Sequence, residues 1–166
     1  MKSLVLFLFV GLFFAAPPPG DKWSAVLKQK IEVVVKNTYE VDQYELEEIE
    51  IESTEESQTK STMSGNLFTI STGAGSQGYI FTAQAPSMKN VFDYIVLFDN
   101  DFKIINTKVL IYREQHGRQI GTKRWLSQFF GMTPTDRPRL GAEIDGISGA
   151  TISSRNMTIA VEQLLS

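Results

Sequence analysis

The chain has 166 residues and a formal net charge of −3. This predicts one domain with a buried core and argues against a nucleic-acid-binding protein, because such proteins usually carry a basic face. The sequence contains no cysteine and a single histidine, His116. These counts exclude disulfides, iron–sulfur clusters, cysteine-linked haem, lipid attachment through cysteine and a metal site built from several histidines.

The first 20 residues have the pattern of a secretory signal. Lys2 precedes an apolar run from Leu4 to Ala16, which is shorter than the ~20 residues that a membrane span needs. Phe13 and Phe14 stand where a cleavage site prefers small residues, so a retained anchor is the alternative. Residues 1–20 are therefore predicted to be a signal peptide or short N-terminal anchor. The protein is expected to be exported, either periplasmic or at the outer face of the cytoplasmic membrane.

Residues 21–166 are expected to form the folded domain, which begins with a helix. Asp21 is the expected N-cap, and the helix is expected to end near Lys36. Apolar residues recur at nearly helical spacing at Trp23, Leu27, Ile31 and Val34 or Val35.

An acidic stretch follows this helix. Residues 40–56 contain nine Asp or Glu residues and no Lys or Arg, which predicts a solvated face, with a docking surface for a partner as the alternative. Within this stretch, Tyr44–Ser53 alternates in part and predicts a strand. Residues 54–66 are polar and predict a loop or a weak helix.

The middle of the chain predicts an antiparallel hairpin. Gly73–Gly78 is expected to be a flexible turn before a strand over 79–85. Residues 92–98 predict the next strand, and Asp99-Asn100-Asp101 is expected to turn the chain into a strand over 102–112.

Two helices are expected in the last third of the chain. Thr122–Phe130 predicts a short helix, and Pro134 and Pro138 mark an ordered loop. Ser154–Leu165 predicts a closing helix, with apolar residues at Met157, Ile159, Ala160, Val161, Leu164 and Leu165. The fold class is therefore α+β, a single small domain with an antiparallel sheet and flanking helices.

The sequence DGISGATISS, residues 145–154, precedes that helix and has two readings. In the first it is a glycine turn, with Ser153 or Ser154 as the N-cap. In the second, a glycine turn at a helix N-terminus holds a phosphate. No Gly-Lys-Ser or Gly-Lys-Thr is present, which argues against a nucleotide triphosphatase. Small residues leave the Thr151 hydroxyl accessible to a bulky group, and Asp145 is placed to help deprotonate it or to hold the turn.

The segment Asp145–Thr151 resembles the flavinylation motif of the FMN-binding domain family, whose members include subunits of the sodium-pumping NADH:quinone oxidoreductase and of the Rnf complex. In that family an FMN transferase moves FMN from FAD onto the last Thr of the motif. The resemblance implies covalent FMN on Thr151, with Ser148, Gly149 and Ala150 beside the phosphate. It covers about residues 75–166 and is closest to the small exported members.

The same resemblance extends to Tyr112–Gly117, YREQHG, of which Glu114 and Gly117 match the family's pattern. These two residues are expected to border the flavin. His116 is expected to donate to the ring or relay a proton, with a solvated loop histidine as the alternative. Trp125 is expected to stack on the flavin or to belong to the core.

These expectations favour an extracytoplasmic electron-transfer flavoprotein, more an electron carrier than a self-contained enzyme. Its implied partners are an FMN transferase for maturation and redox proteins, including a membrane electron-transport complex. A flavin-dependent reductase component acting on a small molecule is one alternative, although such reductases usually append a catalytic domain. A non-redox exported binding module is the other.

Overall fold

The computed structural model describes residues 22–50 and 65–166. The predicted signal or anchor, Asp21 and almost all of the predicted loop over 54–66 lie outside the described residues. The helical elements are α1 (Ala25–Tyr39), η1 (Arg118–Gly121), α3 (Lys123–Leu126), η2 (Ser127–Phe129) and α4 (Thr151–Leu165). The strands are β1 (Glu45–Glu48), β2 (Leu67–Thr72), β3 (Gly75–Pro86), β4 (Val91–Phe98) and β5 (Ile104–Ile111).

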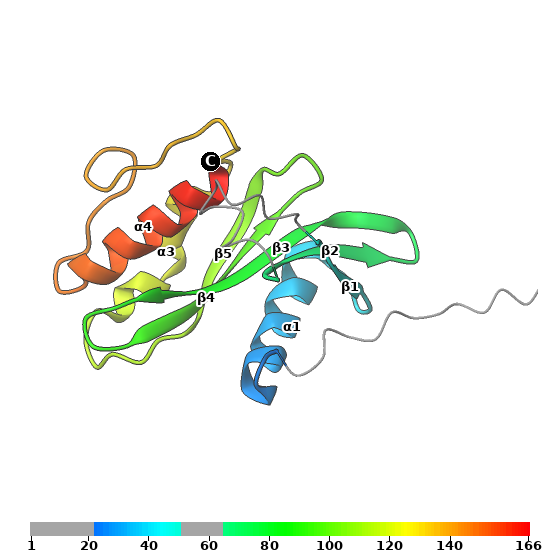
Figure 1. Ribbon diagram of the computed structural model, residues 1–166, viewed down its shortest axis with the longest axis horizontal. Coiled ribbons are helices and arrows are strands. Elements are labelled where there is room, and N and C mark those ends of the chain that lie inside the picture. The colour runs from blue at the N-terminus through cyan, green and yellow to red at the C-terminus, as the bar shows by residue number, and fades with distance from the viewer. Residues whose placement is uncertain (1–21, 51–64) are drawn as a thin grey trace, which may run out of the picture.

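The five strands form one antiparallel sheet in chain order, from β1 at one edge to β5 at the other (Figure 1). The predicted hairpin of residues 92–98 and 102–112 is confirmed, since Ile95 of β4 pairs with Lys108 of β5. Strand β3 pairs with the other side of β4, with Tyr79 opposite Phe98. Every residue of β4 after Val91 is buried, because this strand has neighbours on both sides and is covered on both faces. The α+β class with a central antiparallel sheet is confirmed.

The two faces of the sheet are covered by different helices, with α1 on one side and α3 and α4 on the other (Figure 1). Alternate side chains along each strand point to opposite faces, so the core divides in two. The α1 side contains Ile31, Val35, Phe68, Ile70, Ile80, Ile95, Leu97 and Leu110. The α4 side is larger and includes Phe81, Phe92, Tyr94, Phe129, Met157 and Val161. It is this second layer that carries α4 and the DGISGATISS segment.

The turn predicted over Gly73–Gly78 is confined to residues 73–74, because β3 already begins at Gly75. A side chain at Gly78 would place its Cβ 2.1 Å from the carbonyl oxygen of Phe98, and Gly78 has a φ of +146°. Glycine is therefore required here inside a strand, where the neighbouring backbone approaches closely. Strand β2 was not predicted at all, since its alternation of Phe68 and Ile70 with hydroxyl residues is short.

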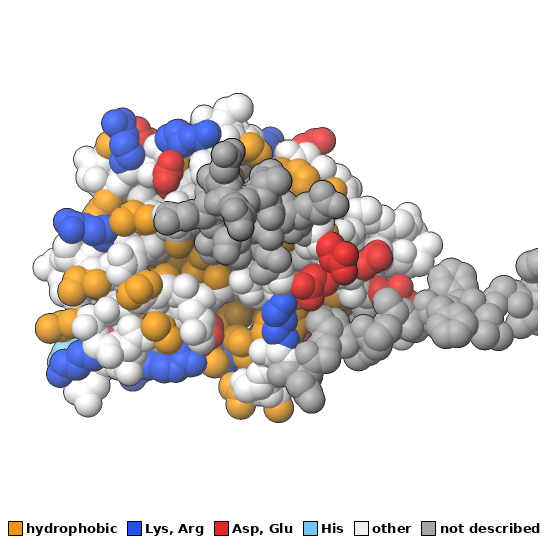
Figure 2. All heavy atoms as spheres, viewed as in Figure 1, with side chains coloured by type: hydrophobic (Ala, Val, Ile, Leu, Met, Phe, Trp, Pro, Cys, Tyr) orange, Lys and Arg blue, Asp and Glu red, His pale blue; other side chains and the backbone are white. Residues whose placement is uncertain are grey.

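The first helix also differs at both ends from its prediction. Its N-cap is Ser24, whose Oγ accepts a hydrogen bond from the backbone N–H of Leu27 at 3.3 Å, and not Asp21. The helix continues to Tyr39 and ends at Glu40 in the left-handed conformation. The predicted strand over 44–53 is shorter among the described residues, at Glu45–Glu48. Glutamates of this strand are exposed, and acidic side chains gather over β1 (Figure 2).

Within residues 22–50 and 65–166, no helix is both long enough and apolar enough to cross a membrane.

Candidate functional site

The backbone just before the motif is anchored to the helical segment 123–129. Ile144 is fully buried. The indole Nε1 of Trp125 donates to the carbonyl oxygen of Asp145 at 2.7 Å, and the Asp145 N–H donates to Gln128 Oε1 at 2.8 Å. Asp145 thus holds the turn through its main chain. Its carboxylate is exposed and makes no hydrogen bond to another described residue.

Trp125 is a core residue rather than a surface platform for a flavin ring. Its side chain is 6% exposed and packs edge-on against Phe129, with ring centroids 5.4 Å apart. The alternative that sequence reasoning gave for this tryptophan, a place in the core, is the one that the structure favours. Its hydrogen bond to the carbonyl oxygen of Asp145 also holds the backbone at the start of the motif in place.

Thr151 is the first residue of α4, three residues before the predicted start of the helix. The prediction that Ser153 or Ser154 caps the helix is wrong, because both are buried inside its first turn. The N-cap position is Ala150, which has no side chain able to accept a hydrogen bond. Thr151 itself is exposed, so its hydroxyl is accessible to a reacting group.

The start of α4 has the features of an anion-binding site. The first N–H groups of any helix lack intrahelical partners, and no side chain caps them here. Gly149 adopts a φ of +80°, with open space where a Cβ would stand. The positive end of the helix dipole and these N–H groups together favour a phosphate. Ser148 is exposed beside them.

Gly117 brings the loop after β5 against the motif. A Cβ at this position would lie 2.7 Å from the Cβ of Ala150, 3.0 Å from the carbonyl oxygen of Gly149 and 3.0 Å from the Tyr112 hydroxyl. Gly117 also has a φ of +77°. The matched glycine of YREQHG is thus required for close packing against Gly149 and Ala150, a contact that the sequence did not predict.

Tyr112 connects the same loop to the first turn of α4. Its hydroxyl lies 3.0 Å from the Oγ of Ser153, which is 2% exposed. This contact joins residues 41 positions apart in the chain and was not predicted. Tyrosine and serine at this spacing carry no local signal, because only the packing of α4 on the sheet brings them together.

The carboxylate of Glu114 is hydrogen-bonded to the turn between β3 and β4. Its Oε1 accepts hydrogen bonds from the Ser87 hydroxyl at 2.6 Å and from the backbone N–H groups of Lys89 at 2.7 Å and Asn90 at 2.9 Å. These bonds, that from Ser87 foremost, hold the pKa of the Glu114 carboxyl below its ordinary value near 4.5. Its observed partners are thus residues of this turn. His116, two residues on, is exposed and has no hydrogen bond among the described residues.

The Glu114 contacts predict a measurable pH effect. A carboxyl whose pKa is lowered in the folded state adds stability above its ordinary pKa, and this contribution is lost as the pH falls through the folded value. We expect the melting temperature of Glu114→Gln to fall less than that of the wild type as the pH decreases from neutrality through 4.5. Glu47→Gln, at an exposed residue of β1, is the control and should follow the wild type. Parallel wild-type and Glu114→Gln curves would contradict this.

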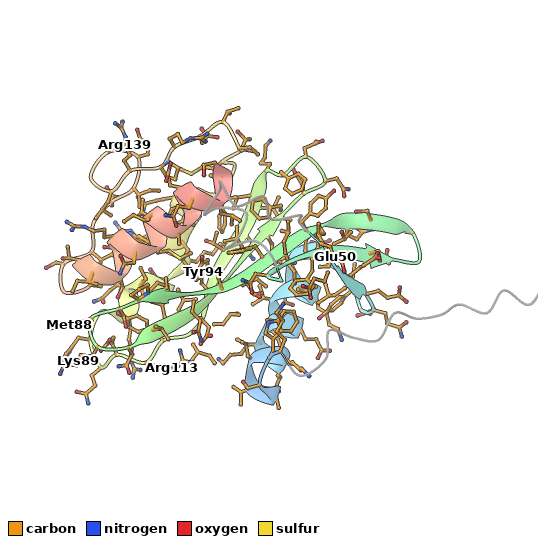
Figure 3. All side chains as sticks on the ribbon, in the orientation of Figure 1. Glu50, Met88, Lys89, Tyr94, Arg113 and Arg139 are labelled. Atoms are coloured by element: carbon orange, nitrogen blue, oxygen red, sulfur yellow. The ribbon has the colours of Figure 1, made fainter. Side chains whose placement is uncertain are left out.

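Residues 88–166 contain 10 Lys or Arg and 8 Asp or Glu, a net charge of +2 in a chain whose total is −3. Figure 3 shows that Arg139 lies on one side of α4, and Met88, Lys89 and Arg113 on the other. The half of the chain that carries the motif is therefore the more positive half, which suits a cofactor with a phosphate group.

The fold and site define a small α+β domain with an accessible threonine at a helix start whose uncapped N–H groups suit an anion. Residues 88–166 match the family model of the FMN-binding domain. This match supports a flavin-binding protein with FMN as its cofactor. A comparison with curated proteins found no match.

Proposed function

We propose that the protein is an extracytoplasmic electron-transfer flavoprotein that carries FMN linked by a phosphoester to Thr151. The observation that carries this proposal is the exposed Thr151 at the uncapped N-terminus of α4, within the residues that match the FMN-binding domain. The other hydroxyls of the first turn, Ser153 and Ser154, are buried. Thr151 is therefore the accessible hydroxyl of this turn.

The attachment reaction balances with FAD as the donor and an FMN transferase as the catalyst. The Oγ of Thr151 attacks the phosphorus that bears the riboflavin part of FAD. A phosphoester bond forms, the bond between the two phosphates breaks, and AMP leaves with the proton of the hydroxyl. The protein gains the mass of FMN less one water.

The residues around Thr151 fit the phosphate of such a group. The open space at Gly149 and the uncapped N–H groups at the start of α4 accommodate a negatively charged ester. Gly117 and Tyr112 support the backbone of the motif from behind. When bound, FMN supplies the redox chemistry, and the protein supplies its position and its electrostatic environment.

An exported location supports covalent attachment. A dissociable cofactor outside the cytoplasm would be lost by dilution, and an ester bond removes that equilibrium. The signal-like sequence of residues 1–20 is the basis for the location. A cofactor held at the exposed Thr151 would also lie near the surface, where a redox partner protein or a membrane electron-transport complex can approach it.

The carrier and the reductase alternatives differ in their kinetics. We expect anaerobically reduced, flavinylated protein to be reoxidised by chemically unrelated acceptors, such as ferricyanide and cytochrome c. The rates should be proportional to acceptor concentration, because a carrier has no separate substrate pocket to saturate. Stopped-flow absorbance of the flavin measures this. Saturable turnover with one small-molecule acceptor would contradict the carrier and favour the reductase.

A further inference from the structure

A groove of about 360 Å³ lies between α4 and the loop at residues 137–140. Such a volume is within the range of small-ligand and cofactor sites. Its lining is apolar at Pro138, Leu140 and Ile159 and polar or charged at Arg137, Arg139, Arg155, Thr158 and Glu162. The groove thus combines an apolar surface with three cationic side chains and one carboxylate.

Helical periodicity places Thr151 on the face of α4 that forms the groove, one turn before Arg155, the first residue of the helix that lines it. Residues advance by about 100° around an α-helix, so Arg155 lies roughly 40° from Thr151 and on the same face. Ser153 is roughly 160° from Thr151 by the same rule, and its hydroxyl contacts Tyr112. The Thr151 side chain therefore lies on the face of α4 that borders the groove, away from the contact with Tyr112.

The dimensions of FMN agree with those of this face. Arg155 is one helical turn from Thr151 and Ile159 is two turns away, about 6 and 12 Å along the axis. An extended ribityl chain covers about one helical turn. A ring joined to Thr151 through that chain therefore begins near Arg155 and extends along the helix toward Ile159.

The wall of the groove is held in place by Arg137. Its guanidinium donates to the carbonyl oxygens of Pro134 at 2.8 Å and of Leu165 at 3.2 Å, which ties the loop to the end of α4. Arg139 is paired with Glu143 at 3.2 Å. Arg155, in contrast, makes no ion pair or hydrogen bond with another described side chain, so its donors are available to a ligand.

We propose that the isoalloxazine ring of FMN on Thr151 occupies this groove and not the surface formed by residues 114–117. The inference rests on the proposed attachment to Thr151. Pro138, Leu140 and Ile159 would contact the apolar part of the ring, and Arg155 would donate to its carbonyl oxygens. A cation in this place favours the negative charge that the ring gains on reduction, so Arg155 raises the reduction potential.

Two exposed aliphatic residues on opposite sides of the sheet provide a test. Ile159 lines the groove and is 45% exposed, whereas Val33 belongs to α1 on the other side and is 54% exposed. We expect Ile159→Trp to reduce the fluorescence of the attached flavin several-fold, because tryptophan quenches a flavin that it contacts. Val33→Trp should leave the fluorescence near that of the wild type.

The potential of the flavin is the second readout. Arg155→Met should lower the midpoint potential, and Arg124→Met, at an exposed arginine of α3, should not. Intact mass establishes beforehand that each protein carries FMN. Equal fluorescence of the two tryptophan variants would contradict the proposed position of the ring in the groove. A midpoint potential that changes in His116→Ala but not in Arg155→Met would contradict it too. Neither result would contradict attachment to Thr151. A wild-type protein without added mass in the presence of active transferase would overturn both proposals.

Discussion

Replacement of Thr151 by alanine is expected to abolish covalent flavin loading without unfolding the domain. Thr151 is exposed and is not the N-cap, and alanine is a good helix former, so stability should change by about 0.5 kcal/mol or less. Co-expression with an FMN transferase, followed by in-gel fluorescence and intact mass, measures the loading. Thr151→Ser should retain part of it, because the nucleophilic oxygen remains.

Ser148 supplies the matched control for this experiment. It is exposed, belongs to the same motif and carries a hydroxyl, but it precedes the helix. Ser148→Ala should therefore still gain the mass of FMN less one water. If loading persisted in Thr151→Ala and were lost in Ser148→Ala, the ester would be on Ser148, and attachment to Thr151 would be contradicted.

Among the residues of the site, the largest effect on folding is expected from Gly117→Ala. The added Cβ would lie 2.7 Å from that of Ala150, and the residue would have to keep a φ of +77°. The left-handed conformation costs a non-glycine residue about 1–2 kcal/mol, and overpacking adds about 1–3 kcal/mol. We expect the free energy of unfolding to fall by roughly 2–5 kcal/mol. Chemical denaturation followed by tryptophan fluorescence measures this.

Two other glycines separate the contributions of strain and packing. Gly149 has a φ of +80° but open space around a Cβ, and Gly146 has open space without a left-handed φ. Gly149→Ala should cost about 1–2 kcal/mol, whereas Gly146→Ala should be nearly neutral. If all three variants unfolded at the same denaturant concentration, the loop after β5 would not pack on the motif as described.

Much of the fold follows from local sequence pattern. The strands from Tyr79 to Ile111 alternate or are continuously apolar, and Asp99-Asn100-Asp101 marks their turn, so their antiparallel pairing was predictable. The sequence pattern gave wrong or missing elements where contacts between distant segments determine the local structure. Gly78 has the composition of a turn but serves a close backbone approach to Phe98, and β2 is too short for its alternation to stand out.

The motif of the candidate site was predictable from the sequence, but the hydrogen bonds that hold the motif in place were not. Thr151 and its glycine-containing neighbours are contiguous in sequence, so their chemistry can be read directly. The hydrogen bonds of Trp125 and Tyr112 to the motif join residues 20 and 41 positions apart, which no local pattern records. Glu114 matched the family pattern, yet its carboxylate bonds the β3–β4 turn, a role that depends on the sheet.

The most direct test of covalent attachment is peptide mass spectrometry of the protein purified from its own host. Cleavage after Arg139 and Arg155 releases residues 140–155, which contain the whole motif up to the first turn of α4. Our account predicts that this peptide carries the mass of FMN less one water, with fragment ions that assign it to Thr151. An unmodified 140–155 peptide, from cells in which a known flavinylated protein is labelled, would contradict it.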